Sequence, residues 1–506
     1  MQLCLLFRSY FVLLFFFFKL DVVYSFFAPT WNGQQNLKKV KCQRSLVKKN
    51  FLEAEELVNL PLPPWDDTSG ATGSLNFLFR ISKGEMKDAI LSGTVRHGSI
   101  YRTIFLGESY IMVGYDAMQC LVDAEDQGKL RVKYPENMQR ILGDDAIILL
   151  DGEKHLTLRK LVFQAFNRKA LESYVPSMES TSLEVVRRWK QDYAGKEAVK
   201  LHPEIRDLII GMGVKVLIGS DILTPERFSK MKDLLSTVAE GLSFPLAWDV
   251  PFTPFGQAMS SRREIFEMLD EIIAEKRAEL LQNAKNVEAK DILSLLLAAE
   301  NEDGSKMSDN AIKDNLVTLT IAAQDTTASA VTSALMNLAL NENLQCIIKE
   351  ELQHAEEKQP HLGFEFFDMC PTLDRFVTET LRMQPPATAA FREVVEDFEF
   401  NGYRVPKDAN VIFMMLGNHY DERSFKHPND FDTARYDRGE GKALAPFGFG
   451  FHTCAGAELA RLEMKVFLKS FLETLKFSLV ESQDLSPDVF KFSVTKSGLL
   501  VRFNDI

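Results

Sequence analysis

The spacing of apolar residues is helical through most of the chain beyond residue 60, and the alternation typical of strands is confined to two segments. Alternating apolar residues around Gly107 predict a hairpin over residues 100–113. Residues 398–413 predict a second short β unit. No internal repeat, low-complexity tract or long linker interrupts the sequence after residue 50. The pattern therefore predicts a mainly α-helical fold with a small β region.

The longest predicted helix begins at Ser308, a residue type that caps helix N-termini, and runs to about Leu340. Between Leu316 and Leu340 its one charged residue is Asp325, while ten of these 25 residues are polar. A stretch of that length is able to span a bilayer, but its hydroxyls and amides favour a helix that passes through a protein core. Because an unpaired buried charge is costly, Asp325 has to meet a cavity or a polar neighbour. Asp325 and Thr326 are thus a candidate active-site pair.

A second helix is predicted over residues 374–383, because Pro385 and Pro386 cannot continue it. Its Glu379 and Arg382 are three residues apart and share one helical face, so their side chains are able to pair. Taken alone, such a pair is typical of a solvated surface and contributes little stability. A role for the Glu379–Arg382 pair therefore depends on which other motifs accompany it in the sequence.

One cysteine lies in a glycine-punctuated loop. The loop runs from Phe447 to Gly456 and contains Cys454, just before a helix that is predicted to begin near Ala457. Backbone N–H groups and the helix dipole lower the pKa of a thiol at such a position, which favours a reactive nucleophile or a thiolate metal ligand. His452 lies two residues away on the same tight loop, a poor geometry for the base of a nucleophile. The six cysteines include no C-x-x-C pair, which argues against a disulfide scaffold or a zinc ribbon.

Composition and charge exclude several classes of protein. The 506 residues include 59 Lys and Arg against 71 Asp and Glu, a net charge of −12 that argues against a nucleic-acid binder. With 46% hydrophobic and 26% charged residues, the chain has ordinary globular usage, which excludes a disordered, collagen-like or multi-span membrane protein. Length alone would suggest three or four domains of roughly 150 residues each.

The first fifty residues differ in charge from the rest. They carry eight basic side chains and one acid, Asp21, which leaves 51 basic and 70 acidic residues, a net charge of −19, in residues 51–506. The apolar run from Tyr10 to Phe18 is nine residues long, the length of a signal peptide and too short for a membrane span of about 20 residues. Residues 1–25 are therefore predicted to be a signal peptide or an uncleaved membrane anchor of the endoplasmic reticulum (ER).

Residues 26–55 are predicted to be a basic, transit-like segment, because no acidic residue occurs between positions 22 and 52. Together with Phe26-Phe27-Ala28-Pro29, this composition resembles the bipartite presequence of proteins sent to the complex plastids of diatoms and related algae. The expected localisation is the plastid, with the ER membrane as the alternative.

The cysteine loop reads F-x-x-G-x-x-x-C-x-G, which is similar to the haem-binding loop of the cytochrome P450 family. The resemblance extends from about Leu60 to Phe503 and implies a single haem-thiolate catalytic domain over residues 56–506, in place of three or four domains. Further motifs of the family occur in its order: Ala322-Ala323-Gln324-Asp325-Thr326-Thr327, then Glu379-Thr380-Leu381-Arg382, then Pro428-Asn429-Asp430-Phe431 followed by Arg435.

The resemblance implies the cytochrome P450 fold, with haem b (iron protoporphyrin IX) held between the long helix and the cysteine loop. Cys454 is then the axial ligand of the haem iron, where an anionic sulfur pushes electron density towards the metal and favours O–O cleavage. Asp325 and Thr326 are implied to deliver protons for that cleavage through water. Where this chain has Ala323 the family usually has glycine, so the shape of the oxygen-binding groove is expected to differ.

Haem propionates are anions, and the family places their basic partners at positions that this chain fills with His155, Arg159, Arg392 and His452. Within this set, His155 and Arg159 are four residues apart on one predicted helical face. Three further residues are implied to form the ion-pair triad that locks the loop region under the haem: Glu379, Arg382 and Arg435.

Within the family, three segments are most similar to the branch of retinoic-acid and sterol hydroxylases: residues 244–256, 385–393 and 400–407. The implied function is a monooxygenase that inserts one oxygen atom from O2 into an apolar isoprenoid, sterol or retinoid-like substrate, at a membrane. A separate electron-donor protein, a reductase or a ferredoxin, is expected because the chain has no flavin or iron–sulfur motif. The alternatives are a donor-independent haem-thiolate isomerase or dehydratase, which usually lacks the pair kept here as Asp325-Thr326, and a non-catalytic haem sensor.

Overall fold

The structure is a computed structural model, and most of the chain beyond residue 56 is described in it. The predicted signal peptide or anchor (1–25) and the transit-like segment (26–55) lie outside the described residues. Described are residues 57–66, 75–105, 107–193, 195–196, 198–219, 222–242, 244, 246–282, 291–301, 304–488, 492 and 494–504.

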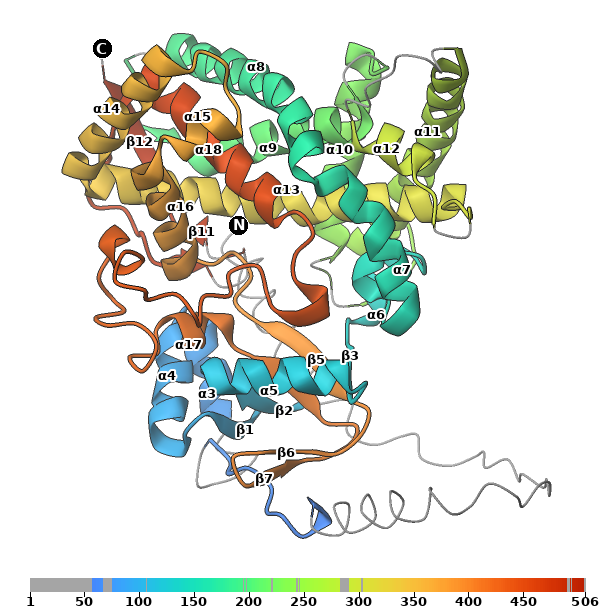
Figure 1. The fold of residues 1–506 in the computed structure, drawn as a ribbon, viewed down its shortest axis with the longest axis vertical. Coiled ribbons are helices and arrows are strands. Elements are labelled where there is room, and N and C mark those ends of the chain that lie inside the picture. The colour runs from blue at the N-terminus through green and yellow to red at the C-terminus, as the bar shows by residue number, and fades with distance from the viewer. Residues whose placement is uncertain are drawn as a thin grey trace.

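Helices dominate the described residues, as the apolar spacing predicts, and most of them gather at one end of the molecule (Figure 1). The α-helices are α3 (Leu75–Ser82), α4 (Met86–His97), α5 (Tyr115–Asp126), α6 (Glu136–Leu142), α7 (Gly152–Phe163), α8 (Arg168–Asp192), α9 (Leu201–Ile218), α10 (Pro225–Leu242), α11 (Pro254–Gln282), α12 (Ile292–Ala298), α13 (Asp309–Leu340), α14 (Glu342–Lys358), α15 (Phe364–Asp368), α16 (Pro371–Met383), α17 (Met415–His419) and α18 (Ala457–Thr474). Short 3-10 helices are η1 (Ile147–Leu149), η2 (Gln164–Phe166), η3 (Thr433–Arg435) and η4 (Gly450–His452).

The β region is small, and its main part lies at the other end, beside α3, α4 and α5 (Figure 1). Its largest sheet has the strand order β1-β2-β8-β5-β3, in which β2 and β8 are parallel and the other neighbours antiparallel. The strands are β1 (Ile100–Ile104), β2 (Glu108–Met112), β3 (Leu130–Val132), β4 (Val199–Lys200), β5 (Ala390–Val394), β6 (Phe398–Phe400), β7 (Tyr403–Val405), β8 (Asn410–Phe413), β9 (Lys476–Leu479), β10 (Pro487–Asp488), β11 (Val494–Thr495) and β12 (Leu500–Asn504).

Both predicted β units form, but the second one is divided. The hairpin around Gly107 is confirmed as β1 and β2, with Ile100 opposite Met112. In the second unit β6 and β7 pair with each other, whereas β8 leaves them and joins the large sheet between β2 and β5. The alternation of apolar residues identifies a strand, but the neighbour that the strand pairs with is a tertiary choice.

The predicted long helix is confirmed as α13, whose N-cap Ser308 accepts a hydrogen bond from the backbone N–H of Ala311 at 3.1 Å. It crosses the helical region in contact with α9, α16 and α18 (Figure 1). Its polar residues between Asn315 and Asn337 are mostly buried against these neighbours, as a core helix requires. Among the described helices, none combines the length and the apolar character that a membrane crossing needs. The helix predicted over residues 374–383 begins three residues earlier, because Pro371 suits the first turn of a helix.

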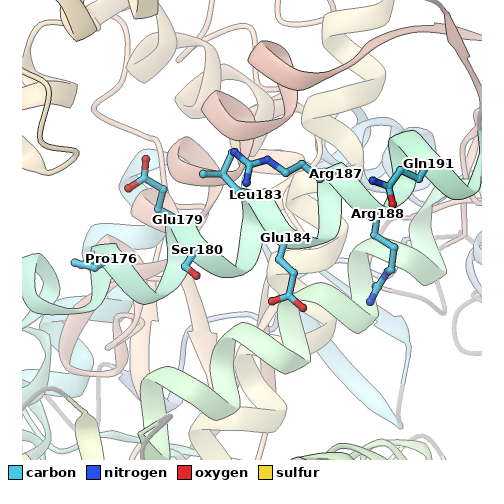
Figure 2. Close-up of a pocket in the computed structure, with 8 residues that line it drawn as sticks. All are labelled: Pro176, Glu179, Ser180, Leu183, Glu184, Arg187, Arg188 and Gln191. Carbon is cyan, nitrogen blue, oxygen red and sulfur yellow. The ribbon is translucent and has the colours of Figure 1, made fainter.

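Helix α8 carries an open depression on its outer face (Figure 2). None of the site residues predicted from the sequence lies on this depression. Its lining consists of side chains that α8 itself points outwards: Pro176, Glu179, Ser180, Leu183, Glu184, Arg187, Arg188 and Gln191.

A buried carboxyl group in α18 is expected to make the stability of the protein depend on pH. Glu463 is 2% exposed, and burial raises its pKa from 4.5 to about 8. Between these two values the unfolded chain loses a proton that the folded chain keeps, so stability falls as pH rises. The slope is at most about 1.4 kcal/mol per pH unit. Replacing Glu463 with Gln should flatten this decline, and denaturant unfolding at a series of pH values measures it.

The matched control for Glu463 is Glu458, an exposed acid in the first turn of the same helix. Glu458→Gln should leave the slope of stability against pH unchanged, because this side chain stays in contact with water when the chain folds. A Glu463→Gln variant that declines between pH 4.5 and 8 as steeply as the parent would contradict the assignment.

Candidate active site

The cysteine loop is closed on itself directly before α18. The backbone N–H of Cys454 donates to the carbonyl of Phe447 at 2.8 Å. Gly448 and Gly450 have φ values of +78° and +64°, a left-handed backbone that a side chain would strain. Gly456 then serves as the N-cap residue of α18. The side chain of Cys454 is exposed, which leaves its sulfur open to a ligand.

The thiol pKa differs from the value predicted at a helix N-terminus. The backbone N–H of Gly456 and the charge of Arg159 do lower the pKa of Cys454, as the position predicts. Burial of the thiol raises it more, so the net pKa lies above the ordinary value and the prediction of a lowered pKa is wrong. The sulfur is reachable from one side, but the protein atoms around its other sides reduce the hydration that would stabilise a thiolate. A raised pKa makes the free thiol a weaker nucleophile, whereas a bound metal would deprotonate it.

Helix α7 brings two of the predicted basic residues to this loop. Arg159 donates from Nη2 to the carbonyl of Thr453 at 2.7 Å, directly beside the cysteine. His155 is buried and stacks on the ring of His452, with ring centroids 4.1 Å apart. His452 Nε2 also lies 3.3 Å from a carboxylate oxygen of Asp151. Three of the four predicted propionate partners therefore form one cluster.

His155 and Arg159 contribute differently to the charge of this cluster. Burial, and then the positive charges of His452 and Arg159, lower the pKa of His155 to about 4. At neutral pH its ring is uncharged and offers one N–H donor. Arg159 thus supplies a permanent cation to the cluster, and His155 supplies a hydrogen bond.

The fourth predicted partner, Arg392 of β5, has a bond that the sequence did not predict. Its Nε donates to Oε1 of Glu125 in α5, and both side chains are 5% exposed. Its Nη1 donates to the backbone carbonyl of Phe391 at 2.9 Å. Arg392 is therefore held from two sides within the structure.

Helix α13 has one open face in an otherwise buried stretch. Four partly or fully exposed residues form this face: Leu319, Ala322, Ala323 and Thr326. Their spacing of three, one and three residues places them on one side of a helix. Most of the residues around them on the helix are buried. Thr326 donates from its hydroxyl to the carbonyl of Ala322 at 2.7 Å, within this face. Small side chains and one hydroxyl thus border open space at the middle of the helix.

Asp325 points elsewhere than its neighbour Thr326. Its carboxylate pairs with Nε of Arg206 in α9 at 2.5 Å, and both side chains are about a quarter exposed. With its amide oxygen turned towards the same guanidinium, Gln324 accepts from Nε at 3.3 Å. The acid of the candidate pair therefore meets a cation on a neighbouring helix, whereas the alcohol does not. The sequence does not indicate Arg206, because a single arginine within a helix has no distinguishing pattern.

The predicted triad forms one fully buried network. Arg382 contacts both carboxylate oxygens of Glu379 at 2.9 Å, and Arg435 reaches Oε1 at 2.9 Å, with all three side chains 0% exposed. Two members were not predicted: the hydroxyl of Tyr436 donates to Glu379 at 2.9 Å, and Glu440 pairs with Arg435 at 2.9 Å. Glu440 balances the charge of Arg435, and Glu379 balances that of Arg382, so these four residues carry no net charge.

Comparison with known proteins now decides the family. The family model described as Cytochrome P450 matches residues 73–503. The chain belongs to the cytochrome P450 family. Abscisic acid 8'-hydroxylase 1 of Arabidopsis thaliana is 28% identical over 432 residues, which cover 84% of this chain and 87% of that protein. Cytochrome P450 26A1 of Danio rerio is 28% identical over 387 residues, covering 74% and 77%.

Solved structures support the same identification of this cytochrome P450. The retinoic acid bound cyanobacterial CYP120A1 matches with a TM-score of 0.75 and 26% identity, over 88% of this chain and all of that chain. The heme domain of cytochrome P450DA matches with a TM-score of 0.73 and 17% identity, over 88% of this chain and 98% of that chain, and shows the fold alone. The predicted fold class and family are confirmed.

The residues present fit haem b, the cofactor of the family. The donor set contains a single open thiol, Cys454, and two guanidinium groups that suit carboxylates, Arg159 and Arg392. The open face of α13 is formed by small and apolar side chains. With hydroxylases among its relatives, this cytochrome P450 is a haem-containing monooxygenase that uses O2 and a separate redox partner, as the sequence predicts.

Proposed function

We propose that this cytochrome P450 hydroxylates an apolar isoprenoid that carries a carboxylate. The observation that carries the proposal is the open face of α13, where Leu319, Ala322 and Ala323 present an uncharged surface at the middle of a buried helix. Burial of apolar area on such a face favours a hydrocarbon skeleton. The names of the relatives add the acid, because both retinoic acid and abscisic acid are isoprenoid carboxylic acids.

The proposed cofactor contacts come from the cluster around the cysteine loop. Cys454 would bind the haem iron through its sulfur, while Arg159, Arg392 and the two histidines would bind the haem carboxylates. When bound, haem b supplies the oxidising chemistry that no side chain of the protein provides. The stack of His155 on His452 and the bond from Arg159 to Thr453 hold these groups in place beforehand.

The proposed proton path uses the two neighbours on α13. Asp325 and Arg206 are partly exposed, so water is able to exchange protons with that carboxylate. Thr326 lies on the open face and needs only to turn its hydroxyl from Ala322 to donate inwards. The acid thus takes protons from solvent, and the alcohol delivers them at the reacting centre.

Replacing Thr326 with Ala is expected to uncouple oxygen consumption from hydroxylation. Without the hydroxyl, protons arrive late and reduced oxygen leaves as peroxide, so product per O2 consumed should fall by roughly 100-fold, the lower end of what a positioned general acid contributes. Peroxide and product are quantified in the same turnover assay. Thr320→Ala is the matched control, because Thr320 makes the same hydroxyl-to-carbonyl bond on α13 at 2.7 Å but is buried. Unchanged coupling in Thr326→Ala would show that another group delivers the protons.

Binding difference spectra of the haem-loaded enzyme test the substrate class. Retinoic acid and retinol share one skeleton and differ in the carboxylate, so they form a matched pair, with abscisic acid and a sterol as further ligands. The proposal expects a substrate-type shift of the haem spectrum for at least one acid and weaker binding of the alcohol. A shift with the sterol or with retinol, and none with either acid, would contradict it.

A further inference from the structure

A buried ion pair joins α5 to β5 beside the cysteine loop. Glu125 lies in the last turn of α5, and its Oε1 accepts from Nε of Arg392, with both side chains 5% exposed. The guanidinium of Arg392 also lies over the ring of Phe449, 5.5 Å from its centroid. Both members of the pair therefore pack against the loop that carries Cys454.

The second oxygen of Glu125 lies against the backbone of that loop. A Cβ atom at Gly450 would collide with this Oε2, and the positive φ of Gly450 disfavours a side chain independently. Oε2 is buried and has no hydrogen-bonding partner among the residues that the structure describes. A buried carboxylate oxygen without a donor is unfavourable, so packing alone gives no reason for an acid here.

The ion pair with Glu125 fixes the orientation of the Arg392 guanidinium. Two of its three nitrogens are fixed, Nε by Glu125 and Nη1 by the carbonyl of Phe391 at 2.9 Å. Within the described part of the chain, no group accepts a hydrogen bond from the third nitrogen, Nη2. Because the guanidinium is planar, fixing two corners also fixes the direction of the third. The arginine is therefore held ready to donate to an anion.

We propose that Glu125 is a positioning residue that holds Arg392 with Nη2 directed at a haem carboxylate. Because the contact between Arg392 and haem is itself part of the proposed function, the role of Glu125 rests on that proposal. Outer residues that orient a ligand-binding group typically change affinity by about 10- to 100-fold. The competing possibility is that Glu125 occupies Arg392 at the expense of the haem carboxylate, which predicts the opposite effect.

Glu125→Gln in the haem-loaded enzyme separates these possibilities. Its neutral amide weakens the anchor, so transfer of haem to apomyoglobin should be about tenfold faster than in the parent. Loss of a buried negative charge near the haem also stabilises the reduced form, so the midpoint potential should move in the positive direction. Rates are taken from the loaded fraction alone, which removes differences in loading. If the glutamine variant does not accumulate, Glu125→Asp should lose haem faster without the positive shift.

Two further variants define the outcome. Glu393→Gln is the matched control, because Glu393 is the next residue on β5 but pairs with Arg131 and Lys133; its haem loss and potential should match the parent. In an Arg392→Gln background, Glu125→Gln should cause no further haem loss. Slower or unchanged haem loss in Glu125→Gln, with faster loss in Arg392→Gln, overturns the role of Glu125. Unchanged loss in Arg392→Gln overturns the proposed contact of Arg392 and, with it, the role of Glu125.

Discussion

Replacing Cys454 with Ser is expected to abolish the red-shifted Soret band of the reduced, CO-bound enzyme, together with all hydroxylation. A serine hydroxyl stays protonated and neutral, so it cannot push electron density towards the iron as a thiolate does. The change replaces one sulfur atom with oxygen and leaves the loop intact, because the backbone bond from residue 454 to Phe447 and the cap at Gly456 do not involve the side chain. Difference spectroscopy after reduction and CO addition measures the band directly.

Cys346 supplies the control for this experiment. It is an exposed cysteine on α14, far along the chain from the loop, and Cys346→Ser should keep the band and the activity. A Cys454→Ser enzyme with an unchanged red-shifted band would refute the assignment of the ligand.

Replacing Glu379 with Ala is expected to lower stability by about 3–5 kcal/mol, the usual cost of breaking a buried ion pair from one side. The change leaves the guanidinium groups of Arg382 and Arg435, both 0% exposed, without their shared carboxylate. It also leaves the hydroxyl of Tyr436 without its acceptor. Denaturant unfolding gives the loss of stability, and the ratio of haem to protein shows whether the loop region still retains its cofactor.

A surface pair close to the network shows what an ordinary ion pair contributes. Asp437 pairs with Arg375 at 2.8 Å, and its side chain is 60% exposed. Asp437→Asn should change stability by no more than about 1 kcal/mol and leave haem content unchanged. Equal losses of stability in the Glu379 and Asp437 variants would show that the buried network contributes no more than a surface ion pair.

Local patterns in the sequence were enough to predict the helical class, the two ends of α13 and the family. Ser308 caps α13 through a bond to a residue three positions away, and the glycines of the cysteine loop meet conformational demands within the loop itself. Such interactions join residues that are near in sequence, so their signals survive without the fold. The order of the motifs then identified Cys454 and its likeness to a haem ligand.

Tertiary structure alone decided which distant residues pair. Arg392 meets Glu125, 267 positions away, Asp325 meets Arg206, 119 positions away, and Tyr436 joins Glu379 across 57 positions. No short sequence motif predicts these long-range pairs, because they depend on how α5, α9 and α16 pack. The thiol pKa shows the same division: the helix terminus that lowers it is visible in the sequence, whereas the burial that outweighs it exists only in the folded chain.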